Sequence, residues 1–220
     1  MTTRAELRNR IRAELNDLGA VPLWADARLN QWIVDGLRHL GRELPLEKSA
    51  SLVTVAGQAG YALPADVLEV TRVEHPTGRF RQPVPAASGD RSPDATLLPG
   101  DAGLEPSELT YDVYGGQLIL SPAPDRAGET VAVRYRGAYA EPSADAMALD
   151  VPTRDEDPVV FYACARAIEW IAMDEAKRQR FERQRGASPA VVAREYDGEA
   201  RSAIRQRRAR VAPRRLVIRE

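Results

Sequence analysis

Two stretches near the N-terminus repeat hydrophobic residues at the spacing of a helix. In residues 3–18 the apolar positions are Leu7, Ile11, Leu15 and Leu18, and a threonine before them can cap the helix. In residues 26–44 they are Leu29, Trp32, Ile33, Leu37, Leu40 and Leu44, and Pro45 ends the helix. Because the connection between the two is short, the pattern predicts an antiparallel helical hairpin.

From residue 51 the apolar spacing changes to two, which is typical of strands. Alternating segments cover residues 51–55, 61–63, 67–73 and 130–135, and the pair Gly115-Gly116 predicts a tight hairpin between residues 111–114 and 117–121. Residues 76–106 are rich in proline, glycine, serine and aspartate, which predicts a long loop with one short strand near residues 80–84. We expect a small, mostly antiparallel sheet of five or six strands.

Helical spacing returns after these strands. Residues 155–185 predict a third helix with an acidic start, which the helix dipole favours, and residues 189–208 predict a fourth with Pro189 at its first position. The fold class predicted is α+β, a four-helix bundle-like core with an inserted small antiparallel β-sheet domain and an extended C-terminal arm. The bundle core is assigned to Leu29, Trp32, Ile33, Leu37, Leu40, Trp170 and Ile171.

These elements divide the chain into parts. Residues 1–48 form the N-terminal helical hairpin, and residues 49–140 form the inserted β-rich domain with its long loop 76–106. Residues 141–208 complete the bundle, and residues 209–220 form the arm. With 220 residues and 44% hydrophobic residues, the chain is long enough to bury a sizeable core.

The net charge of −1 conceals an uneven distribution. Acidic residues dominate 101–160, whereas residues 201–220 hold eight arginines and one glutamate. Such opposite charges favour contact between copies of the chain or with a charged partner, and two solvated surfaces are the alternative. The residues that would make such contacts are Arg205, Arg207, Arg208, Arg210, Asp155, Glu156 and Asp157.

Catalytic chemistry is not indicated by any motif. His39 and His75 are the only histidines, neither lies at metal-ligand spacing, and the single cysteine, Cys164, is expected to be a buried packing residue. The cluster at residues 155–157 could hold a cation, but a helix start accounts for it more simply. We predict no enzyme, no cofactor and no metal. No apolar run approaches the roughly 18 residues of a membrane span, so we expect a soluble protein made in a cytoplasm.

The arginine-rich C-terminus is the one segment that could carry function directly. Its arginines could neutralise phosphates, which makes a nucleic-acid-binding protein an alternative, although no aromatic residue is interleaved for base stacking. The triplet Leu216-Val217-Ile218 favours an arm that adds a strand to the sheet of a partner. A solvated tail is the third reading.

Four segments then occur in a familiar order. They are Trp24-Ala-Asp-Ala-Arg-Leu-Asn-Gln-Trp, Tyr61-Ala-Leu-Pro-Ala-Asp-Val-Leu, Leu118-Ile-Leu-Ser-Pro-Ala-Pro and Val131-Ala-Val-Arg-Tyr-Arg-Gly, followed by the alanine-rich helix after Pro152. From about residue 4 to residue 208 the chain resembles the head–tail connector (adaptor) proteins of tailed bacteriophages and related gene transfer particles. Another neck or tail component is the alternative.

The resemblance implies a homo-oligomeric ring, commonly a dodecamer, at the virion neck under the portal protein. DNA would pass through its channel without sequence-specific binding, and the next neck or tail protein would dock on the other side. Residues 51–136 would face the tail side or neighbouring subunits. The portal-binding arm would consist of Arg214, Arg215, Leu216, Val217, Ile218 and Arg219. Such a protein would be made in the cytoplasm of the bacterial host, without a membrane partner.

Overall fold

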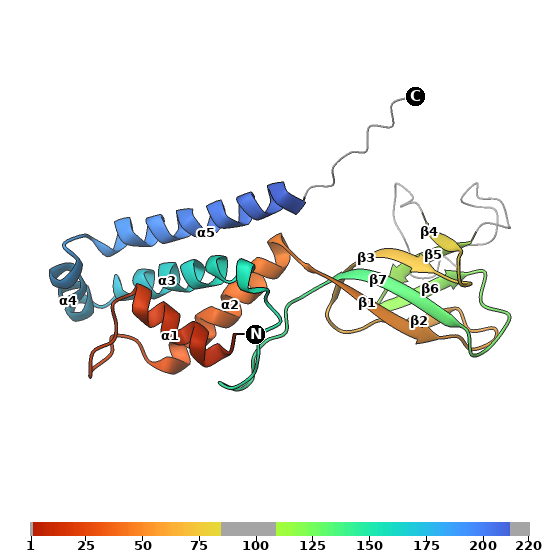
Figure 1. The fold of residues 1–220 in the computed structure, drawn as a ribbon, viewed down its shortest axis with the longest axis horizontal. Helices are drawn as coiled ribbons and strands as arrows, with labels where there is room; N and C mark the ends of the chain where they lie inside the picture. The colour runs from red at the N-terminus through yellow and green to blue at the C-terminus, as the bar shows by residue number, and fades with distance from the viewer. Residues whose placement is uncertain (1, 85–108, 212–220) are drawn as a thin grey trace, which may run out of the picture. The chain divides into compact units, whose positions relative to one another are not determined.

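The computed structural model describes residues 2–84 and 109–211. The predicted arm at residues 214–219 and most of the predicted loop 76–106 therefore lie outside the described residues. The chain divides into two compact units (Figure 1). The helical unit consists of residues 1–45 and 138–220, and the β unit consists of residues 46–137.

The helical unit contains five described α-helices and one short 3₁₀-helix. Their bounds are α1 (Arg4–Glu14), α2 (Asp26–Glu43), η1 (Thr153–Asp155), α3 (Asp157–Ile171), α4 (Glu175–Arg185) and α5 (Pro189–Val211). Figure 1 shows α3 lying between α5 and the pair α1 and α2. Because α3 is covered on several sides, nine of its residues are buried, which explains its alanine-rich sequence.

The first helix is shorter than the predicted range of residues 3–18. It begins with a capping box, in which Thr3 and Glu6 each bind the backbone N–H of the other. It ends at Glu14, because Asn16 adopts a left-handed conformation with φ of 52°. The buried carboxylate of Asp17 then accepts the N–H of Leu23 at 2.7 Å, which turns the chain toward α2.

The third predicted helix, residues 155–185, is wrong as a single element. It is split into α3 and α4, and the side chain of Asp174 accepts the N–H of Lys177 at 3.2 Å to cap α4. An aspartate that caps a new helix competes with continuation of the old one. The described part of the unit therefore has five α-helices where four were predicted. The predicted second helix, residues 26–44, differs from α2 by one residue, and the predicted fourth helix extends to Val211 as α5.

Helices α2 and α3 cross at a glycine. A Cβ atom at Gly36 would lie 3.1 Å from Cγ1 of Val159 and 3.3 Å from both the carbonyl oxygen of Val159 and Cδ1 of Tyr162. The lack of a side chain thus lets the two helices approach closely at this point.

The described residues of the β unit form a seven-stranded sheet, which has one or two strands more than predicted. Its strands are β1 (Leu46–Val53), β2 (Gly60–Ala62), β3 (Val67–Glu74), β4 (Phe80–Pro83), β5 (Thr110–Tyr114), β6 (Gln117–Ser121) and β7 (Thr130–Gly137). Their order is β1-β7-β3-β4-β5-β6-β2, and every neighbouring pair is antiparallel except β4 and β5. The predicted short strand near residues 80–84 is present as β4.

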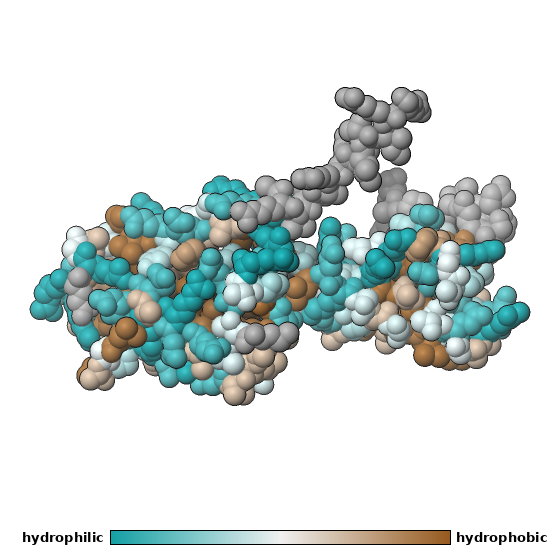
Figure 2. Space-filling model, viewed as in Figure 1, coloured by the Kyte–Doolittle hydropathy of each residue, from teal (hydrophilic) through white to brown (hydrophobic). Residues whose placement is uncertain are grey.

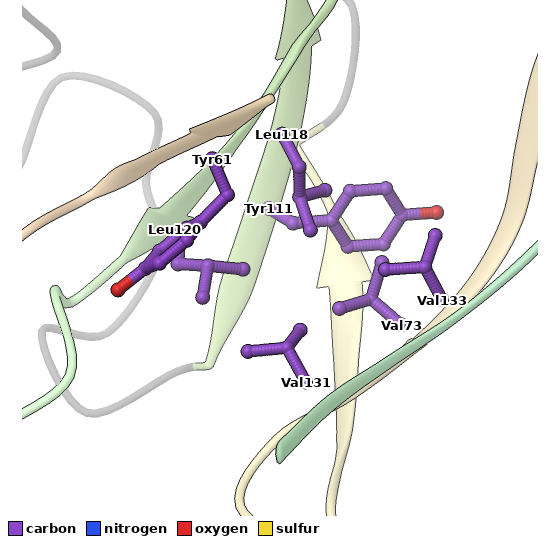
Figure 3. Close-up of a cluster of buried hydrophobic side chains, with 7 residues drawn as sticks. All are labelled: Tyr61, Val73, Tyr111, Leu118, Leu120, Val131 and Val133. Carbon is purple, nitrogen blue, oxygen red and sulfur yellow. The ribbon is translucent and has the colours of Figure 1, made fainter. Parts of the chain in front are cut away.

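The predicted hairpin at Gly115-Gly116 is confirmed. The two glycines have φ of 58° and 75° and connect β5 to β6, in which Tyr114 pairs with Gln117. Buried side chains from several strands of the sheet pack into one hydrophobic cluster. Figure 3 shows this cluster, which consists of Tyr61, Val73, Tyr111, Leu118, Leu120, Val131 and Val133. The β unit therefore has a hydrophobic core of its own.

Candidate interaction surfaces

The acidic residues around the start of α3 pair with arginines of two other helices. Asp155 accepts a hydrogen bond from Nε of Arg207 at 2.7 Å. Arg10 lies 3.6 Å from Glu156 and also pairs with Asp157. Asp155 and Glu156 are buried. Because Arg10 belongs to α1 and Arg207 to α5, these pairs connect α1, α3 and α5 within one chain.

Another predicted charge contact also has its partner within the chain. Nη2 of Arg208 lies 2.5 Å from Oε2 of Glu43, and its Nε donates to the carbonyl oxygen of Glu43 at 3.0 Å. Arg205 is exposed, whereas the side chain of Arg210 lies outside the described residues. The end of α5 thus lies beside the end of α2, and the C-terminal segment after Val211 starts there.

Tyr139 is hydrogen-bonded to the same end of α2. Its hydroxyl donates to the carbonyl oxygen of Leu44 at 2.9 Å. Burial, followed by the nearby carboxylates of Asp155 and Asp150, raises the pKa of Tyr139 to about 12. The phenol therefore remains a hydrogen-bond donor at neutral pH.

The residues assigned to the bundle core differ in burial. Leu29, Ile33, Leu37, Leu40 and Ile171 are fully buried, and Trp32 is nearly so. Trp170 is only half-buried, and it meets Trp32 edge to face with ring centroids 6.3 Å apart. Its ring also lies near two cations, with Nζ of Lys177 4.0 Å and Cζ of Arg28 5.8 Å from the ring centroid.

Sequence reasoning missed Trp24 as a core residue. Its side chain is 1% exposed, and its Nε1–H donates to the carbonyl oxygen of Ala167 in α3 at 2.9 Å. The available signal was its position just before the helix start, where a hydrophobic residue commonly packs against the first turns. An indole N–H that is buried needs a partner, and the small Ala167 leaves its carbonyl within reach.

Sequence reasoning also missed a buried polar network in the β unit. The side chain of Arg81 is buried, and its Nη2 donates to Nδ1 of His75 at 3.1 Å. Since a guanidinium has only donors, His75 accepts at Nδ1 and donates from Nε2 to Glu129, 3.1 Å away. Burial lowers the pKa of Arg81. The alternation of apolar and polar residues along the sequence gave no reason to expect that an arginine of the short strand β4 is buried.

The same arginine connects three segments of the β unit. It donates to the carbonyl oxygens of His75, Thr110, Ser121 and Pro122 at 2.9–3.2 Å. These acceptors follow β3, begin β5 and end β6. Arg81 therefore has a structural role as a clamp at one end of the sheet.

Two segments at one end of the helical unit expose hydrophobic residues. They are the α1–α2 connection and the turn between α3 and α4. Leu18 is 71% exposed, Val21 70% and Met173 85%. Figure 2 shows hydrophobic residues at the surface of the end that carries the α1–α2 connection. The β unit exposes its own apolar residues, which are Val53, Val55, Leu68, Phe80, Val113 and Tyr114.

The described residues contain no cluster of three or more histidine, cysteine, aspartate or glutamate side chains that could hold a metal ion. His39 stacks on Tyr162 with ring centroids 5.1 Å apart, whereas His75 belongs to the β unit. Cys164 is buried, and burial raises the pKa of its thiol. No helix in the described part of the chain has the length and apolar character to span a membrane.

A helical unit and a β unit, each with its own buried hydrophobic residues, define an α+β protein. The model of the SU10 adaptor protein family matches residues 2–218. The chain therefore belongs to this family of phage head–tail adaptors, which are structural proteins of the virion neck that interact with portal and tail proteins. A search among curated proteins finds no match.

Proposed function

We propose that the chain assembles into a closed homo-oligomeric ring beneath the portal, with a dodecamer as the expected size. DNA passes through the channel of this ring without sequence-specific contacts. The observation that carries the proposal is the match to the adaptor family over nearly the whole chain. A closed ring repeats one heterologous interface, so a modest contact between neighbours suffices to hold it together.

The C-terminal segment binds the portal in this proposal. The pairing of Arg208 with Glu43 supports it, because it fixes the end of α5 beside the end of α2 and gives the arm a defined starting point. Arginines at 214, 215 and 219 suit an acidic surface, and Leu216-Val217-Ile218 suit strand addition to a partner sheet.

The β unit contacts neighbouring subunits or the tail-side protein. Among the described residues, its first strand, β1, pairs with β7 and lies at one edge of the sheet. Val53 and Val55 are exposed at the end of this strand, and Tyr114 is exposed at the β5–β6 hairpin. A sheet edge next to exposed apolar side chains suits contact with another protein.

The test compares the full chain with a truncation that ends at Val211. The proposal expects both proteins to form rings of the same mass in native mass spectrometry, while only the full chain binds assembled portals in sedimentation. A matched variant replaces Arg214, Arg215 and Arg219 by glutamine and keeps the apolar triplet. Unchanged portal binding of the truncation would reject the arm assignment, and a full chain that stays monomeric alone and with portals would reject the ring.

A further inference from the structure

One end of the helical unit combines exposed apolar side chains with residue types that dominate protein interfaces. We call this the end surface, and it consists of Leu18, Val21, Trp170 and Met173 with Arg28, Lys177 and Arg180 around them. Exposed single apolar residues are ordinary, but Trp, Met and Arg gathered beside them are typical of interface centres. The contacts of these residues show that they form one surface.

The α1–α2 connection and α4 are joined directly. Nη2 of Arg180 in α4 donates to the carbonyl oxygen of Val21 at 3.1 Å. Met173 lies in the turn before α4, and its N–H donates to the carbonyl oxygen of Trp170. Lys177, in the first turn of α4, lies over the ring of Trp170. Leu18, Val21 and Met173 are therefore held on neighbouring segments.

The α1–α2 connection is also clamped at its base. Asp17 accepts the N–H of Leu23, so the two ends of the exposed segment 18–22 are held together. Arg12 pairs with Asp17 and donates to the carbonyl oxygen of Trp24 at 2.8 Å. A segment whose base is fixed loses little conformational freedom on binding, which favours a docking role for its apolar side chains.

Three arginines near the end surface contact an aromatic ring or a backbone carbonyl. Arg28 contacts the ring of Trp170, Arg180 donates to a backbone carbonyl, and Arg183 donates to the carbonyl oxygen of Gln179. Within the described part of the chain, none of these three arginines has a carboxylate partner. A partner that meets them with carboxylates gains electrostatic complementarity as well as apolar burial.

The end surface also lies far from the start of the C-terminal arm. It adjoins α4, which precedes α5, whereas the arm follows the other end of α5. The 23 residues of α5 correspond to a length of about 34 Å. A portal that binds the arm therefore leaves the end surface to another protein.

We propose that the end surface docks into an apolar groove with an acidic rim on the tail-side neighbour of the adaptor. This inference rests on the proposed function, because it takes the C-terminal arm as the portal contact. Leu18 and Met173 enter the groove, and Arg28 and Arg180 face its carboxylates.

The experiment uses the full chain, its portal and the purified neck or tail protein encoded by the same phage. The variants are Leu18→Asp, Met173→Asp and Arg28→Glu, and the control is Arg201→Glu at an exposed position of α5, outside both the end surface and the β unit. We expect each end-surface variant to bind the tail-side protein about tenfold more weakly or worse. The control should bind it normally, and all four should melt at nearly the wild-type temperature and form wild-type rings.

The outcomes separate the two proposals. Wild-type affinity of the end-surface variants for the tail-side protein overturns the inference, as does a wild-type chain that does not bind that protein. If the end-surface variants lose ring formation, the surface contacts a second copy of the chain, and if they lose portal binding, it contacts the portal. Either result also overturns the inference. A wild-type chain that neither forms rings nor binds portals instead rejects the proposed function.

Discussion

Arg207 near the end of α5 donates from Nε to Asp155, which lies 52 positions earlier in the turn before α3, at a distance of 2.7 Å. Asp155 is buried, and its other arginine contact, Arg154, is 3.7 Å away with a largely exposed side chain. The base of the predicted portal-binding arm is therefore tied to the acidic start of α3 in the same chain.

Replacing Arg207 by methionine should destabilise the protein. The change leaves the buried carboxylate of Asp155 without its close partner, and such a loss costs about 3 kcal/mol. Urea unfolding followed by circular dichroism measures it. Arg205→Met, at an exposed position of the same helix, should change the free energy of unfolding by no more than about 0.5 kcal/mol.

The double variant Arg207→Met with Asp155→Asn tests whether the unpaired carboxylate of Asp155 causes this loss of stability. Removing both charges should recover part of the lost stability, because no unpaired buried charge remains. Simple addition of two separate losses would show that the pair is not coupled.

Replacing Arg81 by methionine should loosen the β unit. The carbonyl oxygens of Thr110, Ser121 and Pro122 each lose the hydrogen bond from Arg81, and a buried acceptor left unpaired costs about 1–3 kcal/mol. Amide hydrogen exchange should increase first in β5 and β6. The control is Arg136→Met, whose pair with Glu69 is exposed on both sides and should contribute less than about 1 kcal/mol. Equal effects of the two substitutions would contradict the clamp role of Arg81.

A side chain at Gly36 should separate α2 from α3. Gly36→Leu forces atoms into the space occupied by Val159 and Tyr162, and such overpacking costs about 1–3 kcal/mol. Gly198→Ala in α5 is the matched control, because its Cβ meets no atom within 4 Å. The control should stabilise the chain by about 1 kcal/mol, since alanine favours the helix. Thermal unfolding distinguishes the two, and a stabilising Gly36→Leu would show that the crossing is loose.

Asp145 should make stability depend on pH. Hydrogen bonds from Arg8 and then Arg4 hold the pKa of Asp145 below its usual value of 3.8. A carboxylate whose folded pKa is lowered stabilises the fold above its unfolded pKa, and this stabilisation is lost as the pH falls through the folded pKa. The melting temperatures of the wild type and Asp145→Asn should therefore differ most at neutral pH and converge below about pH 3.8.

High salt offers a second check on that site. Asp145 is exposed, so added salt should screen its attraction to Arg4 and Arg8 and reduce the difference between the two proteins. If the difference in melting temperature stays constant across pH and salt concentration, Asp145 stabilises the fold through packing and not through its charge.

Local sequence determined several features of this protein. The period of α2, the capping threonine of α1 and the Gly115-Gly116 hairpin follow from side-chain spacing, capping chemistry and permitted φ angles, which act within a few residues. Sequence likewise carried the resemblance to head–tail adaptors, because its motifs are segments of contiguous residues. The family match over residues 2–218 confirmed that resemblance.

Tertiary structure decided what depends on residues far apart in the chain. The split after α3, by contrast, follows from a local cap at Asp174 that apolar periodicity does not register. Burial of Arg81 depends on carbonyl groups from three separate segments, and the pairing of Arg207 with Asp155 depends on how α5 packs on α3. Spacing along a chain specifies which face of an element is apolar, but the partner of each polar group is chosen only when the elements pack together.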